Sequence, residues 1–366
     1  MTQDPGLASW LQLTLTPGLG AVTIRQLLAQ FGQPENVLGA KRADLSRFAG
    51  SEALRALDSE AVARAVERAL AWLEQSGNAI VTLADAAYPQ LLLEIPDPPA
   101  LLYCRGRTEL LNRPALAVVG SRNATAQGAD NAERFARSFS EAGLTIVSGL
   151  AQGIDAAAHR GGLAGGGSTV AVLGTGVDVA YPQANAALQA DIADRGLLVS
   201  EFALSTRAFG HNFPRRNRLI SGLAQGCLVI EAALASGSLI TARAAAEQGR
   251  EVFAVPGSIH SPLAKGCHGL IKSGAKLVES AEDVLSELAA FRRTGFASTR
   301  APTDVSRDAA GAEEPLLACM GFDPVDVDSL CARAGLPAER VSSELLRLEL
   351  AGRVSVLPGG LYQRLN

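Results

Sequence analysis

Aromatic residues make up only 5% of this 366-residue chain, whereas glycine occurs 37 times. That balance disfavours a β-sandwich rich in aromatic residues and favours tight turns between elements rich in alanine and valine. Hydrophobic residues nevertheless reach 48% and charged residues 19%, which is enough apolar material for a large core. The composition therefore excludes a disordered or fibrous protein.

Cysteine is also sparse, and no two of the five cysteines form a Cys-x-x-Cys pair with metal-ligand spacing. We interpret them as buried thiols in a reducing compartment. No apolar run approaches the roughly 18 residues that span a bilayer, and the first residues lack a basic segment followed by an apolar one. The sequence therefore predicts a cytosolic protein with no metal site.

An excess of positive charge is missing as well. The chain has 33 Lys and Arg residues against 37 Asp and Glu residues, which gives a net charge of -4. A general polycation is thus excluded. If the protein binds nucleic acid, it must do so through a local basic patch.

The residue composition and apolar periodicity change along the chain and predict four segments. We expect a helical domain over residues 1–76, a larger domain over 77–290, a linker over 291–311 and a small domain over 312–366. The linker is predicted because that stretch is polar and lacks apolar periodicity.

In the first segment, helical spacing is interrupted by Pro17-Gly18-Leu19-Gly20. The arrangement is typical of small helical domains of the SAM or helix-hairpin-helix type. In a helix-hairpin-helix, the glycine turn lets backbone N–H groups approach a phosphate. An ordinary helix-helix turn explains the pattern equally well.

In the second segment, short apolar runs alternate with helical patterns. The predicted strands are Ala79–Leu83, Ala100–Tyr103, Ala115–Val119, Thr145–Ser148, Thr169–Leu173, Leu197–Ser200, Leu228–Ile230, Val252–Val255 and Leu277–Val278. The predicted helices cover 128–142, 153–164, 184–194, 214–224, 239–248 and 280–290. Continuously apolar strands separated by helices indicate a parallel sheet covered on both faces. The predicted fold class is therefore α/β, with a Rossmann-like, doubly wound parallel sheet.

The last segment predicts two helices and then two short strands joined by Pro358-Gly359-Gly360, an order typical of a winged helix. It carries eight acidic residues against five basic ones, a net charge of -3. A helix that reads duplex sequence is expected to be basic. Our hypothesis is that this domain contacts protein or regulates, rather than reading duplex DNA.

Glycine-rich turns follow several predicted strands. They are Gly120-Ser121-Arg122-Asn123, Gly149-Leu150-Ala151-Gln152-Gly153, Gly174-Thr175-Gly176 and, a few residues after the strand that ends before Glu231, Ser236-Gly237-Ser238. Ligands of open parallel sheets bind at the carboxyl ends of the strands. Each turn alone is explained by the general preference of βα turns for glycine. Their recurrence at one edge indicates a phosphate-bearing ligand, held by backbone N–H groups and helix N-termini.

A basic patch is present in the segment 207–218. It contains Arg207, Arg215, Arg216 and Arg218, and no acidic residue lies between Glu201 and Glu231. Arginine suits phosphate geometry, and the adjacent phenylalanine at position 213 could stack on a base. Two alternatives remain open: the phenylalanine as a core residue, and the arginines as a solvated helix face.

Signatures of catalysis are missing. Gly167 stands where a P-loop needs its lysine, and Val179 stands where a dinucleotide fingerprint needs its third glycine. The histidines show no His-Glu-x-x-His spacing, and there is no Gly-x-Ser-x-Gly elbow. ATP hydrolysis and NAD binding are therefore disfavoured.

The remaining titratable residues near the predicted turns have structural explanations. We expect Asp155 and Asp178 to cap turns and His159 to buttress its helix. We expect Glu231 to be a buried carboxylate that pairs with one of the arginines.

The motifs follow one another in a distinctive order between residues 80 and 275. They include Val118–Arg122, Ser148–Asp155, Leu173–Asp178, Phe213–Leu223, Ser236–Ala242 and Val255–Gly257. In this order they resemble the DNA-processing protein A family (DprA, also called Smf). The helical N-terminal and winged-helix-like C-terminal segments resemble those of longer members. One departure is His268, where the family usually has asparagine.

The resemblance implies a cytosolic protein that binds single-stranded DNA during natural transformation. It further implies protection of incoming strands, loading of the RecA recombinase and a homodimer, with no catalytic turnover and no cofactor. Carried over by motif, the DNA-binding residues are Gly120, Ser121, Arg122, Gly149, Gly153, Phe213, Arg215, Arg216, Asn217, Arg218, Ser236, Gly237 and Ser238.

Two other functions compete with this one. Nucleotide phosphoribohydrolases of the LOG type share a similar sheet, but here no carboxylate follows the turn at 236–241 until Glu247, so the general acid or base is missing. The other is a single-strand binder that acts in conjugation or repair, with the same pocket and a different partner.

Overall fold

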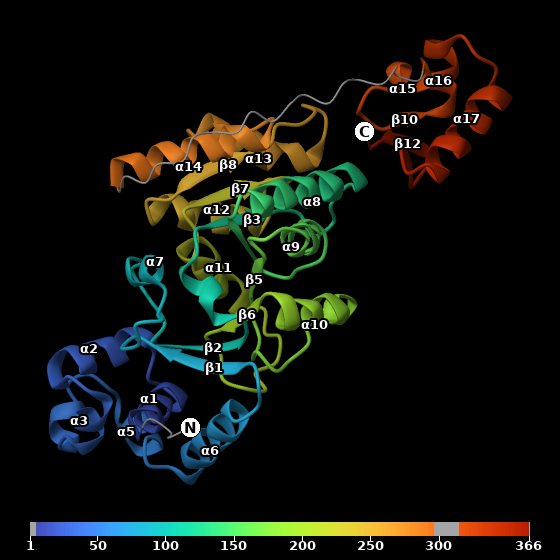
Figure 1. Ribbon diagram of the computed structural model, residues 1–366. Helices are drawn as coiled ribbons and strands as arrows, with labels where there is room; N and C mark the ends of the chain where they lie inside the picture. Colours follow the sequence, from blue (N-terminus) through green and yellow to red (C-terminus); the bar gives the residue numbers. More distant parts are fainter. Residues whose placement is uncertain (1–4, 296–314, 366) are drawn as a thin grey trace.

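The computed structural model describes residues 5–295 and 315–365. A nine-stranded sheet occupies the centre, a group of N-terminal helices lies beside one edge, and a small C-terminal unit follows at the far end of the chain (Figure 1). The predicted α/β class is confirmed.

The sheet has the strand order β1-β2-β6-β5-β4-β3-β7-β8-β9. The strands are β1 (Asn78–Thr82), β2 (Leu101–Gly106), β3 (Ala115–Val119), β4 (Thr145–Ser148), β5 (Thr169–Val172), β6 (Leu197–Ser200), β7 (Gly226–Val229), β8 (Glu251–Ala254) and β9 (Lys276–Leu277). From β6 to β9 every neighbouring pair is parallel. This part of the sheet confirms the doubly wound prediction.

The expectation of a wholly parallel sheet is wrong for β1 and β2. β1 runs antiparallel to β2, and β2 runs antiparallel to β6. The link between β1 and β2 contains only the short helix α7 (Gln90–Leu93). A parallel pair needs a longer crossover that covers the sheet, whereas antiparallel neighbours do not.

Helices cover both faces of the sheet. One face carries α8 (Ala126–Glu141), α9 (Ile154–Ala164) and α14 (Ala281–Gly295); the other carries α11 (Asn212–Gly222), α12 (Ser238–Glu247) and α13 (Lys265–Lys272). Residues of β3 alternate between the two: Leu116 and Val118 pack under α8 and α9, while Val119 packs under α11 and α12. This alternation explains why the strand is apolar throughout. α13 was not predicted from the sequence.

The N-terminal region is helical, as predicted. Its helices are α1 (Pro5–Leu15), α2 (Ala21–Phe31), α3 (Pro34–Gly39), α4 (Arg42–Leu45), α5 (Ser51–Ala56) and α6 (Glu60–Leu73). Trp72 of α6 packs edge-on against Tyr103 of β2, with ring centroids 5.9 Å apart. The helices thereby share one apolar cluster with the sheet, which includes Leu13, Val37 and Leu198. α10 (Ala186–Arg195) joins the same cluster through Ile192.

The C-terminal unit is a winged helix with its own core. It comprises α15 (Pro315–Met320), β10 (Val325–Asp326), α16 (Val327–Ala334), α17 (Ala338–Leu350), β11 (Val354–Leu357) and β12 (Leu361–Arg364). Residues such as Leu317, Leu330 and Leu345 are fully buried together. The predicted order of helices and hairpin is confirmed, and β10 completes a three-stranded sheet with β12 at its centre.

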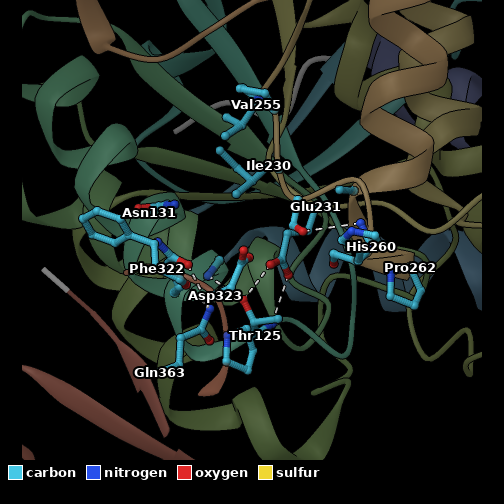
Figure 2. A pocket seen from close by; sticks show the side chains of 18 residues that line it. Thr125, Asn131, Ile230, Glu231, Val255, His260, Pro262, Phe322, Asp323 and Gln363 are labelled. Carbon is cyan, nitrogen blue, oxygen red and sulfur yellow. Dashed lines mark hydrogen bonds between the residues drawn. The ribbon is translucent and has the colours of Figure 1, made fainter. Parts of the chain in front are cut away.

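The winged helix meets the larger domain beside α8. Gln363 of β12 donates a hydrogen bond of 2.9 Å from Nε2 to Oε1 of Gln127. A cavity of about 630 Å³ lies between the two, lined by Thr125 and Glu231 on one side and by Phe322 and Gln363 on the other. Figure 2 shows these side chains together.

The predicted linker 291–311 begins too early, because α14 continues to Gly295. Residues 296–311 lie outside the described residues.

The cysteines were expected to be buried thiols. Cys104, Cys227 and Cys267 are buried, whereas Cys319 and Cys331 are half-buried. Among the helices in residues 5–295 and 315–365, none is long and apolar enough to cross a membrane.

Candidate nucleic-acid interface

A cavity of about 760 Å³ lies at the carboxyl ends of the parallel strands. It is walled by the turn after β3, the start of α11 and the loop before α12. The predicted site residues that line it are Gly120, Ser121, Arg122, Phe213, Arg216, Asn217, Ser236, Gly237 and Ser238. An adjoining cavity of about 270 Å³ shares Arg122, Phe213 and Arg216 and adds Gly149. We refer to the two cavities together as the edge pocket.

Arg122 is the exposed cation of the edge pocket. Its guanidinium lies over the ring of Phe213, 5.7 Å from the centroid. Within residues 5–295 and 315–365, no carboxylate forms an ion pair with Arg122. The turn that carries Arg122 is fixed to the segment after β7, because the Ser121 N–H donates to the Glu231 carbonyl oxygen at 2.7 Å. Arg122 is thus positioned and available for an anion.

Phe213 lies on the pocket wall and not in the core. It is half-buried, and its ring tilts against Tyr181 with centroids 5.5 Å apart. Tyr181 is 41% exposed and was not among the predicted site residues. The turn after β5 that carries it could have suggested it. Two partly exposed rings beside a free guanidinium make a surface on which a planar base can stack.

Arg216 forms the floor of the edge pocket, and it is buried. Only 4% of the residue is exposed. Its Nη1 donates to the carbonyl oxygen of Gly149 at 2.9 Å and also to that of Val172. Burial lowers the pKa of Arg216 to about 10, so the side chain stays charged at neutral pH. It places a desolvated positive charge beneath the pocket, where electrostatic attraction is stronger than in water.

Asp155 lies near this arginine and caps the turn, as predicted. Its carboxylate accepts hydrogen bonds from the backbone N–H groups of Gly149 at 3.2 Å and Ala151 at 3.4 Å. Burial raises the pKa of Asp155, although Arg216 opposes that shift. The carboxylate therefore orders the turn and offsets part of the charge of Arg216.

Two of the predicted arginines do not line the edge pocket. Arg215 and Arg218 both donate to Oε2 of Glu201, at 3.1 Å and 2.6 Å. The side chain of Glu201 is only 2% exposed. The idea that this arginine run lacks an acidic partner is wrong, because the end of β6 brings Glu201 against α11. Arg218 also lies 3.6 Å from Asp97.

The expected pairing of Glu231 with an arginine is wrong too. Its carboxylate accepts from the backbone N–H of Thr125 at 3.0 Å and from the Thr125 hydroxyl at 2.6 Å. Figure 2 shows these two contacts. Gly128 of α8 lies so close that a methyl group there would meet the carboxylate. Glu231 therefore fixes the start of α8.

Gly153 lies directly behind the turn that carries Arg122. Its φ is +76°, and a Cβ at this position would lie 2.6 Å from the Arg122 carbonyl oxygen and closer still to that of Ser121. We expect Gly153→Ala to displace the turn, to destabilise the fold by at least about 2 kcal/mol and to weaken ligand binding. Chemical denaturation measures the loss of stability.

Gly166→Ala is the matched control, because nothing lies within 4 Å of a Cβ there and its φ is not positive. It should change stability by less than about 0.5 kcal/mol. Equal effects of the two substitutions would contradict this explanation.

His159 buttresses α9, as predicted. Its Nε2 accepts from the Leu150 N–H at 3.2 Å, and its Nδ1 lies 2.7 Å from the Thr169 hydroxyl. Burial lowers the pKa of His159 to about 3. The folded state therefore favours neutral imidazole, while the unfolded chain takes up a proton below about pH 6.5.

This shift predicts a pH dependence of stability. The contribution of neutral His159 is present above pH 6.5 and is lost as the pH falls toward 3. Between pH 7 and pH 5 it amounts to about 2 kcal/mol. Denaturation at both pH values should show His159→Gln to be less stable at pH 7 but less sensitive to this change of pH. An unchanged pH dependence in the variant would contradict the assignment.

The fold and the pocket together define a class of protein. It is a Rossmann-like protein with a winged helix at its C-terminal end and a basic, glycine-lined pocket at the carboxyl edge of its sheet. The model of the family described as DNA recombination-mediator protein A matches residues 79–289, and that of the DprA winged helix domain matches residues 300–360. The chain belongs to the DNA-processing protein A (DprA/Smf) family.

Individual relatives agree with this assignment. Protein Smf of Escherichia coli (strain K12) is 43% identical over 307 residues, which cover 83% of this chain and 82% of that protein. The crystal structure of DprA from Streptococcus pneumoniae superposes with a TM-score of 0.67 at 39% identity, over 78% of this chain and 99% of that one. A structure of DprA from Helicobacter pylori, described for its single-stranded DNA binding mode, has a TM-score of 0.53 at 29% identity and covers 58% of this chain and 96% of its own.

Proposed function

We propose that this protein binds single-stranded DNA in the edge pocket, protects strands that enter the cell during natural transformation, and passes them to the RecA recombinase. The observation that carries the proposal is the position of Arg122, an exposed guanidinium without an ion-pair partner in the described chain that lies against Phe213. The relative from Helicobacter pylori, described for its binding of single-stranded DNA, supports it.

The chemistry of the pocket suits an unpaired strand. Arg122 offers a forked donor to a phosphate, and the hydroxyls of Ser236 and Ser238 lie 2.7 Å apart at the start of α12. A base can stack beside Phe213 and Tyr181 only if it is not paired in a duplex. We therefore expect phosphates to bind Arg122 and the glycine-serine turns, with a base against the aromatic wall.

Exposed apolar side chains occur outside the edge pocket. Leu234 is 71% exposed, Ile259 is 68% exposed, and Leu277 is 47% exposed. Single exposed apolar side chains are common on protein surfaces, whereas a contiguous apolar patch marks an interaction site. We propose that surfaces outside the edge pocket serve the homodimer and the contact with RecA.

The proposal includes no catalytic turnover. Of the carboxylates in residues 5–295 and 315–365, only Asp155 lines the larger cavity, and one of its oxygens accepts hydrogen bonds from backbone N–H groups. A general acid or base needs a carboxylate that can reach the substrate. Release of free base from AMP would favour the competing phosphoribohydrolase function.

The direct test compares a labelled oligo-dT strand with a duplex of the same length by fluorescence anisotropy. We expect tight binding of the single strand and much weaker binding of the duplex. Equal affinity for both would contradict the proposal. A pull-down of RecA with and without the strand tests the partner; no retention of RecA would favour a role in conjugation or repair.

We also propose that the winged helix adds little to strand affinity. Its sequence is acidic overall, and the hydrogen bond from Gln363 to Gln127 joins it to the larger domain at α8, outside the edge pocket. Removal of residues 312–366 should therefore leave the affinity for oligo-dT within about twofold of the full chain. Anisotropy with both proteins checks this, and a loss of tenfold or more would overturn it.

A further inference from the structure

The loop between β6 and α11 carries two stacked aromatic side chains, Phe209 and His211, that lie on the surface and outside the core. Phe209 is 51% exposed, and its ring stacks on the imidazole of His211 with centroids 5.8 Å apart and an interplanar angle of 14°. His211 is exposed as well. An exposed phenyl ring contributes little to folding, so this pair is accessible to a ligand without loss of core packing.

The base of this loop is held in one conformation. Ser205 has a φ of +62°, a backbone conformation that residues other than glycine rarely adopt. Its N–H donates to both carboxylate oxygens of Asp178, at 2.8 Å and 2.9 Å, and its hydroxyl donates at 3.1 Å. The Gly176 N–H donates to the Thr206 carbonyl oxygen at 2.9 Å. These bonds fasten the loop to the turn after β5.

The far end of the loop is fastened too. The Asn212 side chain donates to the Gly174 carbonyl oxygen at 3.1 Å, and its backbone N–H donates to the Phe209 carbonyl oxygen at 3.0 Å. The ring of Phe209 is therefore presented from a fixed backbone. A pre-formed aromatic surface loses less conformational entropy on binding than a mobile one.

The pair is continuous with the edge pocket. Ala208 and Gly210, the two neighbours of Phe209 in sequence, both line the larger cavity. Tyr181 and Phe213 line the same cavity. Aromatic side chains thus occur both on the pocket wall and on the loop at its margin.

The charge near the pair favours an anionic chain. Arg207 is exposed and, in the described part of the molecule, forms no ion pair. Asp178, at the base of this loop, is engaged by Ser205, and Glu201 at its start is paired with Arg215 and Arg218. A strand that leaves the edge pocket along this loop would meet a cation for its phosphate and a ring for its base.

We propose that Phe209 and His211 form a second base-stacking site, which takes the unpaired base next to the nucleotide held in the edge pocket, while Arg207 binds the phosphate between them. This inference rests on the proposed function and names the place where the strand leaves the pocket. Stacking on a ring needs no particular base, so the site lengthens the bound strand without adding sequence preference.

The test uses the full-length protein and two labelled strands of about 15 nucleotides, one of oligo-dT and one with the same phosphates but no bases. Phe209→Ala should weaken binding of oligo-dT by about 5- to 50-fold and leave the affinity for the strand without bases unchanged. Phe209→Trp should restore or raise the affinity for oligo-dT. Phe322→Ala is the matched control, because Phe322 is 52% exposed but lies in the winged helix.

The outcomes separate this inference from the proposed function. If wild type binds oligo-dT and Arg122→Glu loses it, but Phe209→Ala binds as wild type does, the second site is overturned and the proposed function stands. Equal weakening of both strands by Phe209→Ala also overturns it, because the ring then acts through the loop structure. If wild type binds neither strand at low salt, both proposals fail.

Discussion

Arg122→Glu should lower the affinity for oligo-dT by at least about 100-fold and leave the unfolding midpoint unchanged. Loss of a charge-assisted hydrogen bond to phosphate removes about 1.5–3 kcal/mol, and the new carboxylate adds repulsion. Stability should not change, because Arg122 is exposed and forms no ion pair in the described chain. Anisotropy and chemical denaturation measure the two quantities separately.

The matched control for this result is Arg68→Glu. Arg68 is an exposed arginine on α6, outside the edge pocket, and the substitution makes the same change in net charge. Its effect on affinity should be less than about threefold, because surface charges more than about 10 Å from the strand are screened by salt. If both substitutions weaken binding equally, the strand responds to net charge and not to the edge pocket.

Arg216→Ala has the largest expected effect on stability, a loss of about 3–5 kcal/mol. The substitution leaves the carbonyl oxygens of Gly149 and Val172 without a buried donor, and it leaves Asp155 without its cationic neighbour. Gly149 must be a glycine because a Cβ there would lie 2.6 Å from Nη2 of Arg216. The site and the core are therefore built around the same guanidinium.

Arg216→Lys separates charge from geometry. Lysine keeps the positive charge but lacks the planar fork that reaches two carbonyl oxygens. We expect an intermediate loss of stability in denaturation experiments. An alanine variant as stable as wild type to within about 0.5 kcal/mol would contradict the assignment of Arg216 as the floor of the pocket.

The contrast between Arg122 and Arg216 shows which parts of the site could be predicted from the sequence. Turns after apolar strands predicted where the pocket lies, because the carboxyl ends of parallel strands meet at one edge. The sequence could not show that Arg216 is buried while Arg122 is exposed. That difference depends on Gly149, which lies far away in the chain and leaves space for a guanidinium.

The errors have a related physical cause. Arg215 and Arg218 were expected to have no acidic partner, but Glu201, directly after β6, pairs with both, and neither arginine lines the edge pocket. Likewise, the apolar pattern of β1 and β2 predicted strands correctly but not their direction. Apolar periodicity reports local structure and burial, whereas the partner of a charge and the direction of a strand are set by contacts distant in sequence.

The central claim is that the edge pocket is an electrostatic site for single-stranded DNA, and the salt dependence of oligo-dT binding tests it most directly. Anisotropy titrations over a salt series should give a plot of log K against log salt with a slope steeper than about -2, since each neutralised phosphate of a single strand contributes about -0.7. Arg122→Glu should make that slope shallower by about 0.7, the contribution of one neutralised phosphate. A wild-type protein that ignores the strand at low salt, or binds it with a slope near zero, would contradict the claim.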